Sequence, residues 1–370
     1  MSKNTEVIPF TELVERTSEI ARERADVQPK IRGYVNQVYN YEIGRKWDWN
    51  FLLVGSTITT RQSYSTGTVS ANTGSTVATF SSDVALDATY TGSQLRITGN
   101  DVVYDCVYES ATSLTIQPPL SGNANITSQG YNLYFPFYAL PTDFDRYPKN
   151  GGFANWIGGN QKVIQETPFQ EWGLNYSSNP SDTPERLRII GTNTAGNQVI
   201  EINPPPKNAK SYLNNYYQSL TPMSETTAGL IGNITSGGTN VLGDTNCRFL
   251  EATTGDYLRI DALGKSNDSL WYRIISIQNN SALTLQTAFA TTGITSANYV
   301  ICSAPQMPVK LHPAILYGAV LQCVSDQDDP LVQGYMMKLA EVMSDGKRLY
   351  VSRIYNQDIH TLAEDWMYRR

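Results

Sequence analysis

Charged side chains are scarce in this chain of 370 residues. Lys, Arg, Asp and Glu make up 17% of it, against roughly 25% in an average soluble protein, and the formal net charge is −6. Uncharged polar residues take their place. Neighbouring subunits can cover such a surface at little desolvation cost, because few ions lose their water. The composition therefore favours an assembly component over a freely diffusing enzyme.

Residues that serve catalysis or metal binding are also few. The chain has two histidines. His312 stands before a proline at a predicted helix start, where a capping or surface position is expected, and His360 has no Cys or acidic residue at metal-ligand spacing. A glycosidase would need only two acids. The candidates in the aromatic segment 135–172 are Asp143, Asp145, Glu166 and Glu171. Residues 141–145 have the composition of a turn between strands, which disfavours catalysis by the acids there. Because catalytic and ligating residues are so few, we predict no enzyme, no cofactor and no metal site.

Long apolar runs and paired cysteines are absent as well. The longest apolar run, residues 314–324, is shorter than the ~20 residues that span a bilayer, so no membrane segment is expected. No stripe of Lys and Arg marks a dedicated nucleic-acid binder. The cysteines have neither metal nor redox spacing and are expected to be buried free thiols. They are Cys106, Cys247, Cys302 and Cys323.

Helical periodicity is confined to the two ends of the chain. Residues 10–24 predict an amphipathic helix, and a second helix runs from near Asp26 to Gly44 with Pro29 in its first turn. The aromatic cluster Trp47, Trp49 and Phe51 follows and is expected to anchor these helices onto a sheet. Near the other end, residues 311–323 predict a helix. An acidic turn at 326–330 separates it from a last helix at 331–349.

Between these ends, residues 57–304 show short alternating runs typical of antiparallel strands, and one block occurs twice. Residues 91–98 (TGSQLRIT) match residues 254–261 (TGDYLRID), and SLTIQ at 113–117 matches ALTLQ at 282–286. Residues 102–108 correspond to 271–277, which pairs Cys106 with Ile275, and residues 131–134 correspond to 299–302. The second copy has six extra residues. We predict two duplicated modules of about five strands, each a small barrel or sandwich, inserted into a host domain.

The order of these segments resembles that of bacteriophage head-to-tail adaptor (connector) proteins. The resemblance rests on the helix pair, the Trp-rich junction, ALPTDF at 139–144, LHPAILYGA at 311–319 and a closing helix. It covers residues 1–60, 136–232 and 305–370. The family core is shorter than this chain, so the duplicated modules stand outside the resemblance.

The resemblance implies a structural virion protein that forms a ring, commonly of twelve copies, beneath the portal. Such a ring connects capsid to tail in the neck of the virion, after assembly in the host cytoplasm, and lines a channel through which genomic DNA passes without sequence-specific binding. Its expected partners are sister copies, the portal protein, and tail, nozzle or fibre proteins. The implied docking element for portal or neighbour is the last segment, through Tyr350, Arg353, Tyr355, Trp366, Tyr368, Arg369 and Arg370.

The predicted fold class is α+β, with a helical bundle core from both chain ends, an antiparallel β region and two inserted modules. The predicted divisions are N-terminal helices (1–60), first module (61–135), central β part (136–232), second module (233–304), helix hairpin (305–349) and docking tail (350–370). Two other functions stay open: a tail fibre, receptor-binding or carbohydrate-binding tail subunit, and a virion glycosidase.

Overall fold

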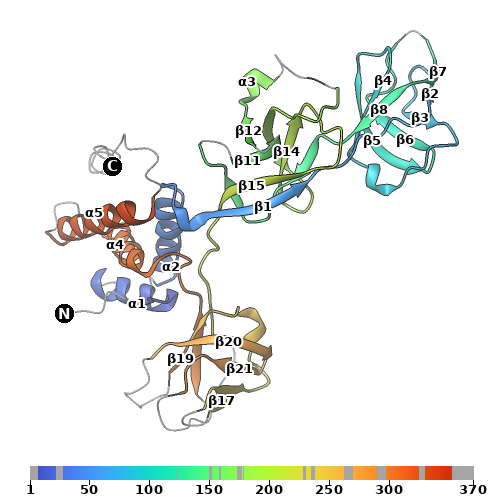
Figure 1. The fold of residues 1–370 in the computed structure, drawn as a ribbon. Coiled ribbons are helices and arrows are strands. Elements are labelled where there is room, and N and C mark those ends of the chain that lie inside the picture. Colours follow the sequence, from blue (N-terminus) through green and yellow to red (C-terminus); the bar gives the residue numbers. More distant parts are fainter. Residues whose placement is uncertain are drawn as a thin grey trace. The chain divides into compact units, whose positions relative to one another are not determined.

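The chain is an α+β protein with helices near both ends and several antiparallel sheets, shown in the computed structural model of Figure 1. The structure describes residues 7–21, 28–122, 124–149, 152–157, 160–172, 177, 179–227, 231–234, 238–261, 270–289, 297–324 and 330–351. It divides into two compact units. Unit 1 comprises Met1–Phe51 and Ser219–Arg370, and unit 2 comprises Leu52–Gln218.

The helices of unit 1 come from both ends of the chain. They are α1 (Phe10–Ala21), α2 (Gln28–Gln37), α4 (His312–Cys323) and α5 (Pro330–Tyr350). Helix α4 contacts the other three, which explains why its apolar residues point in every direction. Gly318 permits the close approach of the α2 end, since a Cβ there would lie 2.6 Å from Val38 Cγ1.

Helix α2 continues as a π-helix over Val38–Gly44. This wider turn shifts the buried stripe, so that Tyr39 and Ile43 face the core while Glu42 is half-buried. A uniform α-helical period, which the sequence pattern assumes from Asp26 to Gly44, does not anticipate this shift.

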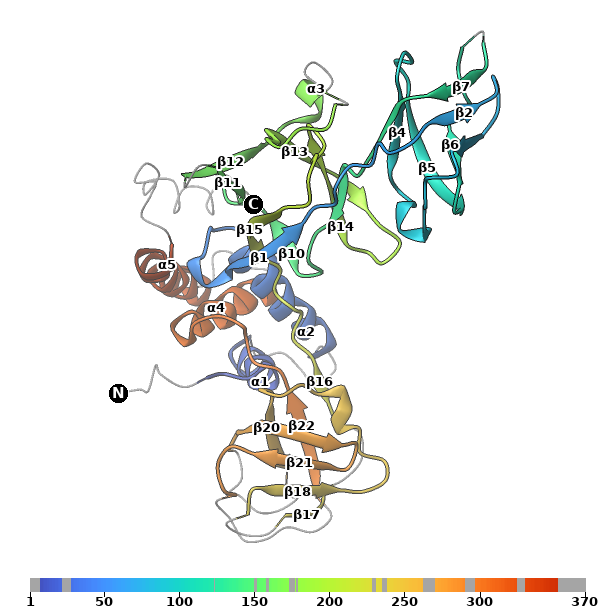
Figure 2. The ribbon, with the colours of Figure 1, turned by 45° about the vertical axis from the view of Figure 1, so that its right-hand side comes forward.

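The second module belongs to unit 1 and is a seven-stranded sheet in the order β16-β22-β19-β20-β21-β18-β17. Its strands are β16 (Glu225–Thr226), β17 (Ile231–Ile234), β18 (Asn240–Gly243), β19 (Tyr257–Asp261), β20 (Tyr272–Asn279), β21 (Ala282–Leu285) and β22 (Asn298–Cys302). Figure 2 shows them wrapped around one interior. That interior is a continuous core that includes Phe249, Leu258, Tyr272 and Tyr299.

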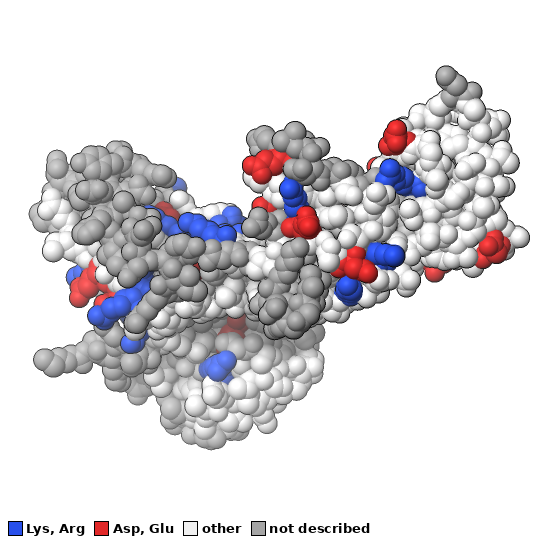
Figure 3. All heavy atoms as spheres, turned by 45° about the horizontal axis from the view of Figure 1, so that its top comes forward, with Lys and Arg blue, Asp and Glu red and all other residues white. Residues whose placement is uncertain are grey.

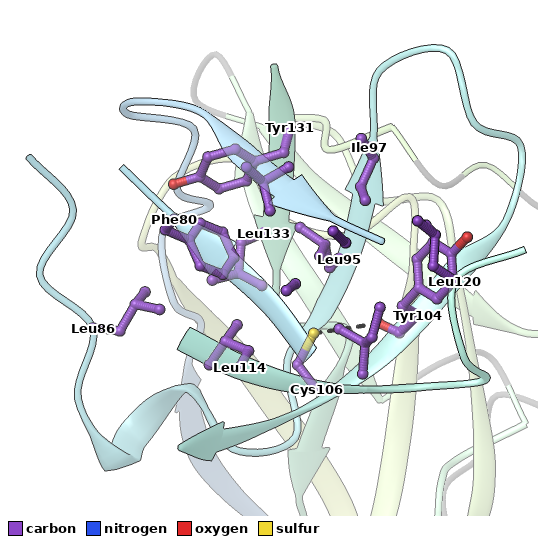
Figure 4. Close-up of a cluster of buried hydrophobic side chains, with 14 of the residues drawn as sticks. Phe80, Leu86, Leu95, Ile97, Tyr104, Cys106, Leu114, Leu120, Tyr131 and Leu133 are labelled. Atoms are coloured by element: carbon purple, nitrogen blue, oxygen red, sulfur yellow. Dashed lines mark hydrogen bonds between the residues drawn. The ribbon is translucent and has the colours of Figure 1, made fainter. Parts of the chain in front are cut away.

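The first module belongs to unit 2 and has the order β7-β2-β3-β6-β5-β4-β8. Its strands are β2 (Val69–Ala71), β3 (Val77–Phe80), β4 (Gln94–Ile97), β5 (Val103–Ser110), β6 (Ser113–Gln117), β7 (Ile126–Gln129) and β8 (Tyr131–Tyr134). Figure 4 shows side chains from several strands, among them Leu95, Leu114 and Tyr131, meeting in its core. Phe80 packs edge-on against Tyr131, with 4.9 Å between ring centroids.

The two modules share one path: β8-β4-β5-β6-β3-β2 in the first corresponds to β22-β19-β20-β21-β18-β17 in the second. Strand β16, which pairs with β22, also has a counterpart in the first module: the isolated bridge between Tyr64 and Leu133 of β8. Gly92 and Gly255 occupy the same turn, both with a positive φ that side chains rarely adopt.

The pairing of Cys106 with Ile275 was wrong by one residue. Gly92 N–H donates to Cys106 O and Gly255 N–H donates to Ile274 O, so Cys106 corresponds to Ile274. Ile274 is buried, whereas Ile275 is 48% exposed and lies at a register shift in β20. One of the six extra residues is therefore a bulge inside the strand, which a count of loop residues overlooks.

The rest of unit 2 is a sheet in the order β1-β15-β11-β12-β13-β14-β9, with β10 beside β15. The strands are β1 (Leu53–Thr59), β9 (Phe137–Ala139), β10 (Phe144–Arg146), β11 (Phe153–Ile157), β12 (Asn160–Glu166), β13 (Arg186–Thr192), β14 (Gln198–Asn203) and β15 (Ser211–Gln218). Leu140, Phe144 and Tyr212 lie in its core. The predicted turn at 141–145 is confirmed, since Phe144 N–H donates to Pro141 O at 3.1 Å.

Candidate docking site

The end of α5 lies against the Trp-rich junction, at the point where the implied docking tail begins. Trp49 is fully buried, and its indole N–H donates to Ile43 O at 2.7 Å. Phe51 stacks on Trp49 with 5.6 Å between centroids and meets Tyr350 edge-on at 6.0 Å. Val351 forms a bridge to Trp49. The aromatic cluster therefore holds the end of a helix, whereas the sequence predicted an anchor onto a sheet.

Two features of α5 allow this contact. Gly346 is buried, and a Cβ there would collide with Leu311 Cδ2 and lie 3.7 Å from the Trp49 ring. Next to it in the chain, Lys347 places its ammonium 2.9 Å from the centre of the Trp47 ring. Burial, together with the charge of Lys46, lowers the pKa of Lys347 to about 8. A cation packed on an aromatic face thus fixes the end of α5.

Of the predicted docking residues, Tyr350 lies in the described part, where it is half-buried in this cluster. The remaining ones, Arg353, Tyr355, Trp366, Tyr368, Arg369 and Arg370, lie outside the described residues. Lys347 and Gly346 were not predicted from the sequence. The sequence feature that could have indicated them is a glycine followed by a lysine in the last turns of a helix, in a chain that also has a Trp-rich segment.

The outer side of α5 is partly apolar. Met337 is 74% exposed and Leu349 is 47% exposed, while Val332 and Leu339 are buried. Other apolar residues of α5 are half-buried, namely Tyr335, Met336, Val342 and Met343. Within the described chain, helix α5 therefore leaves apolar side chains exposed away from its buried stripe.

Histidine 312 is buried rather than capping or superficial, contrary to the sequence expectation. Its Nδ1 accepts from Ile8 N–H at 3.1 Å, and its Nε2 lies 3.1 Å from Met307 O. Burial lowers the pKa of His312 to about 4, so the ring is neutral and Nε2 carries the proton that Met307 O accepts. His312 thus ties the segment before α1 to the start of α4.

The acids considered for glycosidase chemistry serve the central sheet or its surface. Asp143 accepts from Tyr216 Oη at 2.7 Å, and Asp145 pairs with Arg146 at 2.7 Å. Glu166 and Glu171 are exposed. Among the described residues no group of three or more His, Cys, Asp or Glu is arranged to hold a metal ion.

The cysteines behave as small apolar residues. Cys106, Cys247 and Cys302 are buried and Cys323 is half-buried, all as free thiols. Burial raises the pKa of the Cys106 thiol to about 12 and that of Cys302 to about 11, which makes both poor nucleophiles. This confirms the prediction of burial for three of the four.

The described surface carries few charges, and Figure 3 shows them as small, separate groups on one face. No helix of the described chain is long and apolar enough to cross a membrane.

The duplicated arginine in Leu-Arg-Ile holds each module to a different neighbour, which the sequence analysis did not foresee. Arg259 makes a bidentate contact with Glu15 of α1, at 2.7 and 2.5 Å, and lies 4.8 Å over the Trp271 ring. Its counterpart Arg96 donates to Asn179 at 2.5 Å. Repetition of an arginine on an otherwise apolar strand was the available signal.

No protein-family model and no curated protein matches the chain. The solved structures that are similar to it include the following two. The phage phi92 endosialidase is 15% identical with a TM-score of 0.17, covering 64% of this chain and 29% of its own. Translation elongation factor SelB from Methanococcus maripaludis is 10% identical with a TM-score of 0.15, covering 69% of this chain and 63% of its own. The chain therefore spans less than two thirds of either protein, and at these TM-scores neither similarity carries an argument.

Proposed function

We propose that this chain is a structural, non-enzymatic virion protein, a head-to-tail adaptor that assembles as a ring of about twelve copies beneath the portal. In this proposal the helices form a bundle, and the two modules are small barrel or sandwich insertions that face tail or fibre proteins. The genome passes through the ring without sequence-specific contacts. The proposed location is the neck of the virion, after assembly in the host cytoplasm.

The observation that carries the proposal is the way the two chain ends meet. Helices α1 and α2 surround α4 together with α5, and His312 of the Leu-His-Pro segment bonds to Ile8 across this junction. A second resembling segment, residues 139–144, forms the turn between β9 and β10, and Leu140 and Phe144 are buried at its ends. Two of the segments that carry the resemblance, residues 139–144 and 311–319, therefore have structural roles, which supports the proposal.

Helix α5 supports the assembly part of the proposal. Its exposed Met337 and Leu349, with half-buried neighbours, offer apolar surface that a sister copy can cover. The aromatic cluster around Trp49 holds Tyr350 and Val351, where the proposed docking tail begins. Twelvefold repetition would multiply a weak tail contact into stable attachment.

Negative-stain imaging of the purified protein, alone and with a portal ring, tests the proposal. We expect rings of about twelve copies that stack coaxially on the portal. A stop codon after Val351 should abolish stacking, while the exposed substitution Val107→Ala on the first module should leave it unchanged. Trimeric rods would support a fibre subunit instead. Monomers that cleave a polysaccharide and ignore the portal would overturn the proposal.

A further inference from the structure

Unit 2 contains a hollow of about 530 Å³ over the outer face of the central sheet. Its floor crosses three strands, because Ala139 on β9 pairs with Val199 on β14, which pairs with Gly191 on β13. These side chains are small, and a Cβ at Gly191 would meet open space. A register shift in β13 next to Gly191 interrupts the regular pleat. The floor is therefore irregular and weakly apolar, and the exposed Ile190 at the register shift also lines it.

The walls come from the first module and the segments that connect it to the sheet. The repeated Thr91-Gly92 turn forms one side, and Phe135, Phe137 and Tyr138 form another. The hydroxyls and the amide that line the hollow come from Thr59, Thr91, Thr192 and Asn193. The volume lies within the range of roughly 300–1,000 Å³ that small-molecule sites occupy.

One cation is held in place at this hollow. The Arg61 guanidinium lies 4.9 Å over the Phe135 ring and donates to Thr89 O. The main-chain N–H of Arg61 donates to Tyr138 Oη at 3.2 Å, and this hydroxyl donates to Phe135 O at 2.7 Å. None of the lining residues is acidic. The nearby acid Asp87 accepts from Thr89 N–H and lies outside the lining.

We propose that this hollow binds a short acidic saccharide. A floor of aliphatic side chains suits the C–H face of a pyranose ring, and the hydroxyl and amide side chains match its hydroxyl groups. The Arg61 guanidinium would then donate charge-assisted hydrogen bonds to the sugar carboxylate. This function goes beyond that of an adaptor and does not depend on it.

An extended peptide fits the same hollow less well. Peptide recognition by a sheet relies on unpaired main-chain groups at an edge. The central floor strand β14 is already paired on both sides, with β13 and β9. A ligand over β14 is therefore held by side-chain and ring contacts, which favours a saccharide.

Isothermal titration calorimetry of the full chain tests the proposal with three probes: trigalacturonate, α-2,8-linked trisialate and neutral maltotriose. We expect at least one acidic probe to bind with a Kd of about 1 mM or tighter, and maltotriose to bind at least roughly tenfold more weakly. Arg61→Gln should weaken acidic binding roughly tenfold, and Arg61→Lys should weaken it less, since it keeps the charge.

The duplication supplies a matched control. Thr91→Trp should fill the hollow and abolish binding, whereas Thr254→Trp, the same change in the equivalent turn of the second module, should leave it intact. Ala139→Trp blocks the floor and serves if Thr91→Trp fails to fold. The proposal is overturned if neither acidic probe binds at about 10 mM, if maltotriose binds as tightly as the acidic probe, or if Thr91→Trp and Thr254→Trp have equal effects.

Discussion

The two modules share a strand path and a core, yet each is held to its surroundings in a different way. In the second module Arg259 is 13% exposed and forms an ion pair with Glu15 of α1. The carboxylate of Glu225 on β16 pairs with Arg32 of α2 and accepts a hydrogen bond from Thr11 of α1. In the first module the equivalent Arg96 makes one exposed contact with Asn179. The repeated motif therefore determines the module's fold, while the surroundings determine what its arginine binds.

The largest expected effect comes from the equivalent core leucines. Leu95→Ala and Leu258→Ala each remove a fully buried side chain, so each should destabilise its own module by about 3–5 kcal/mol. Hydrogen exchange followed by mass spectrometry should show lost protection in strands of that module alone. The exposed pair Val107→Ala and Leu242→Ala should change protection little. Equal loss in both modules from one substitution would contradict their independence.

The second largest expected effect is a difference between the two units in how their stability depends on pH. His312 is held neutral in unit 1 by a pKa of about 4, below its unfolded value near 6.5, and unit 2 contains no histidine. Because the unfolded ring binds a proton first, this stabilisation is complete above pH 6.5 and is lost as pH falls toward 4. Unit 1 should lose roughly 2 kcal/mol between pH 7 and pH 5.

Glu201 in unit 2 should act in the opposite direction. Burial raises the pKa of its carboxyl above the ordinary value, in spite of the bond from Arg188, so acid relieves a cost in the folded state. Hydrogen exchange followed by mass spectrometry at pH 7 and pH 5 would measure the free energy of unfolding of each unit. His312→Asn, which keeps an acceptor for Ile8 N–H, should remove the pH dependence of unit 1. If it persists in this variant, another group is responsible.

A third prediction concerns the two arginines. Arg259→Met breaks a half-buried bidentate pair and should cost about 1–2 kcal/mol, while Arg96→Met should cost under about 1 kcal/mol. Urea denaturation of both variants, with a double-mutant cycle that includes Glu15→Gln, would measure the difference. Equal losses would show that the clamp on α1 does not hold the second module.

The smallest effect should fall on the shared turn. Gly92→Ala and Gly255→Ala each place a side chain at positive φ where no neighbour obstructs it, so each should cost about 1 kcal/mol from backbone strain alone. Thermal unfolding of the two variants should give matching shifts. A much larger loss at Gly255 would point to a contact with Arg273, whose Nη2 would lie 3.9 Å from the new Cβ.

Much of the local structure followed from the sequence because it depends on near neighbours. Alternation along Gln94–Ile97 and the turn at 141–145 were recognisable from residue pattern and turn composition. The register of β20 was not, since Ile275 is apolar like its neighbours and its bulge is set by pairing with β21. The site residues Lys347 and Gly346 were missed for the same reason, because their role depends on Trp47 and Leu311, distant in sequence.

By itself the sequence determined the α+β class, the duplication and the burial of most cysteines, since each is encoded in periodicity, repetition or hydrophobicity. Only the tertiary structure decided that His312 is buried and neutral, that Arg96 and Arg259 bind different neighbours, and that Arg61 lines a hollow over the central sheet. These properties depend on the distance between residues far apart in the chain, and no local pattern encodes that distance.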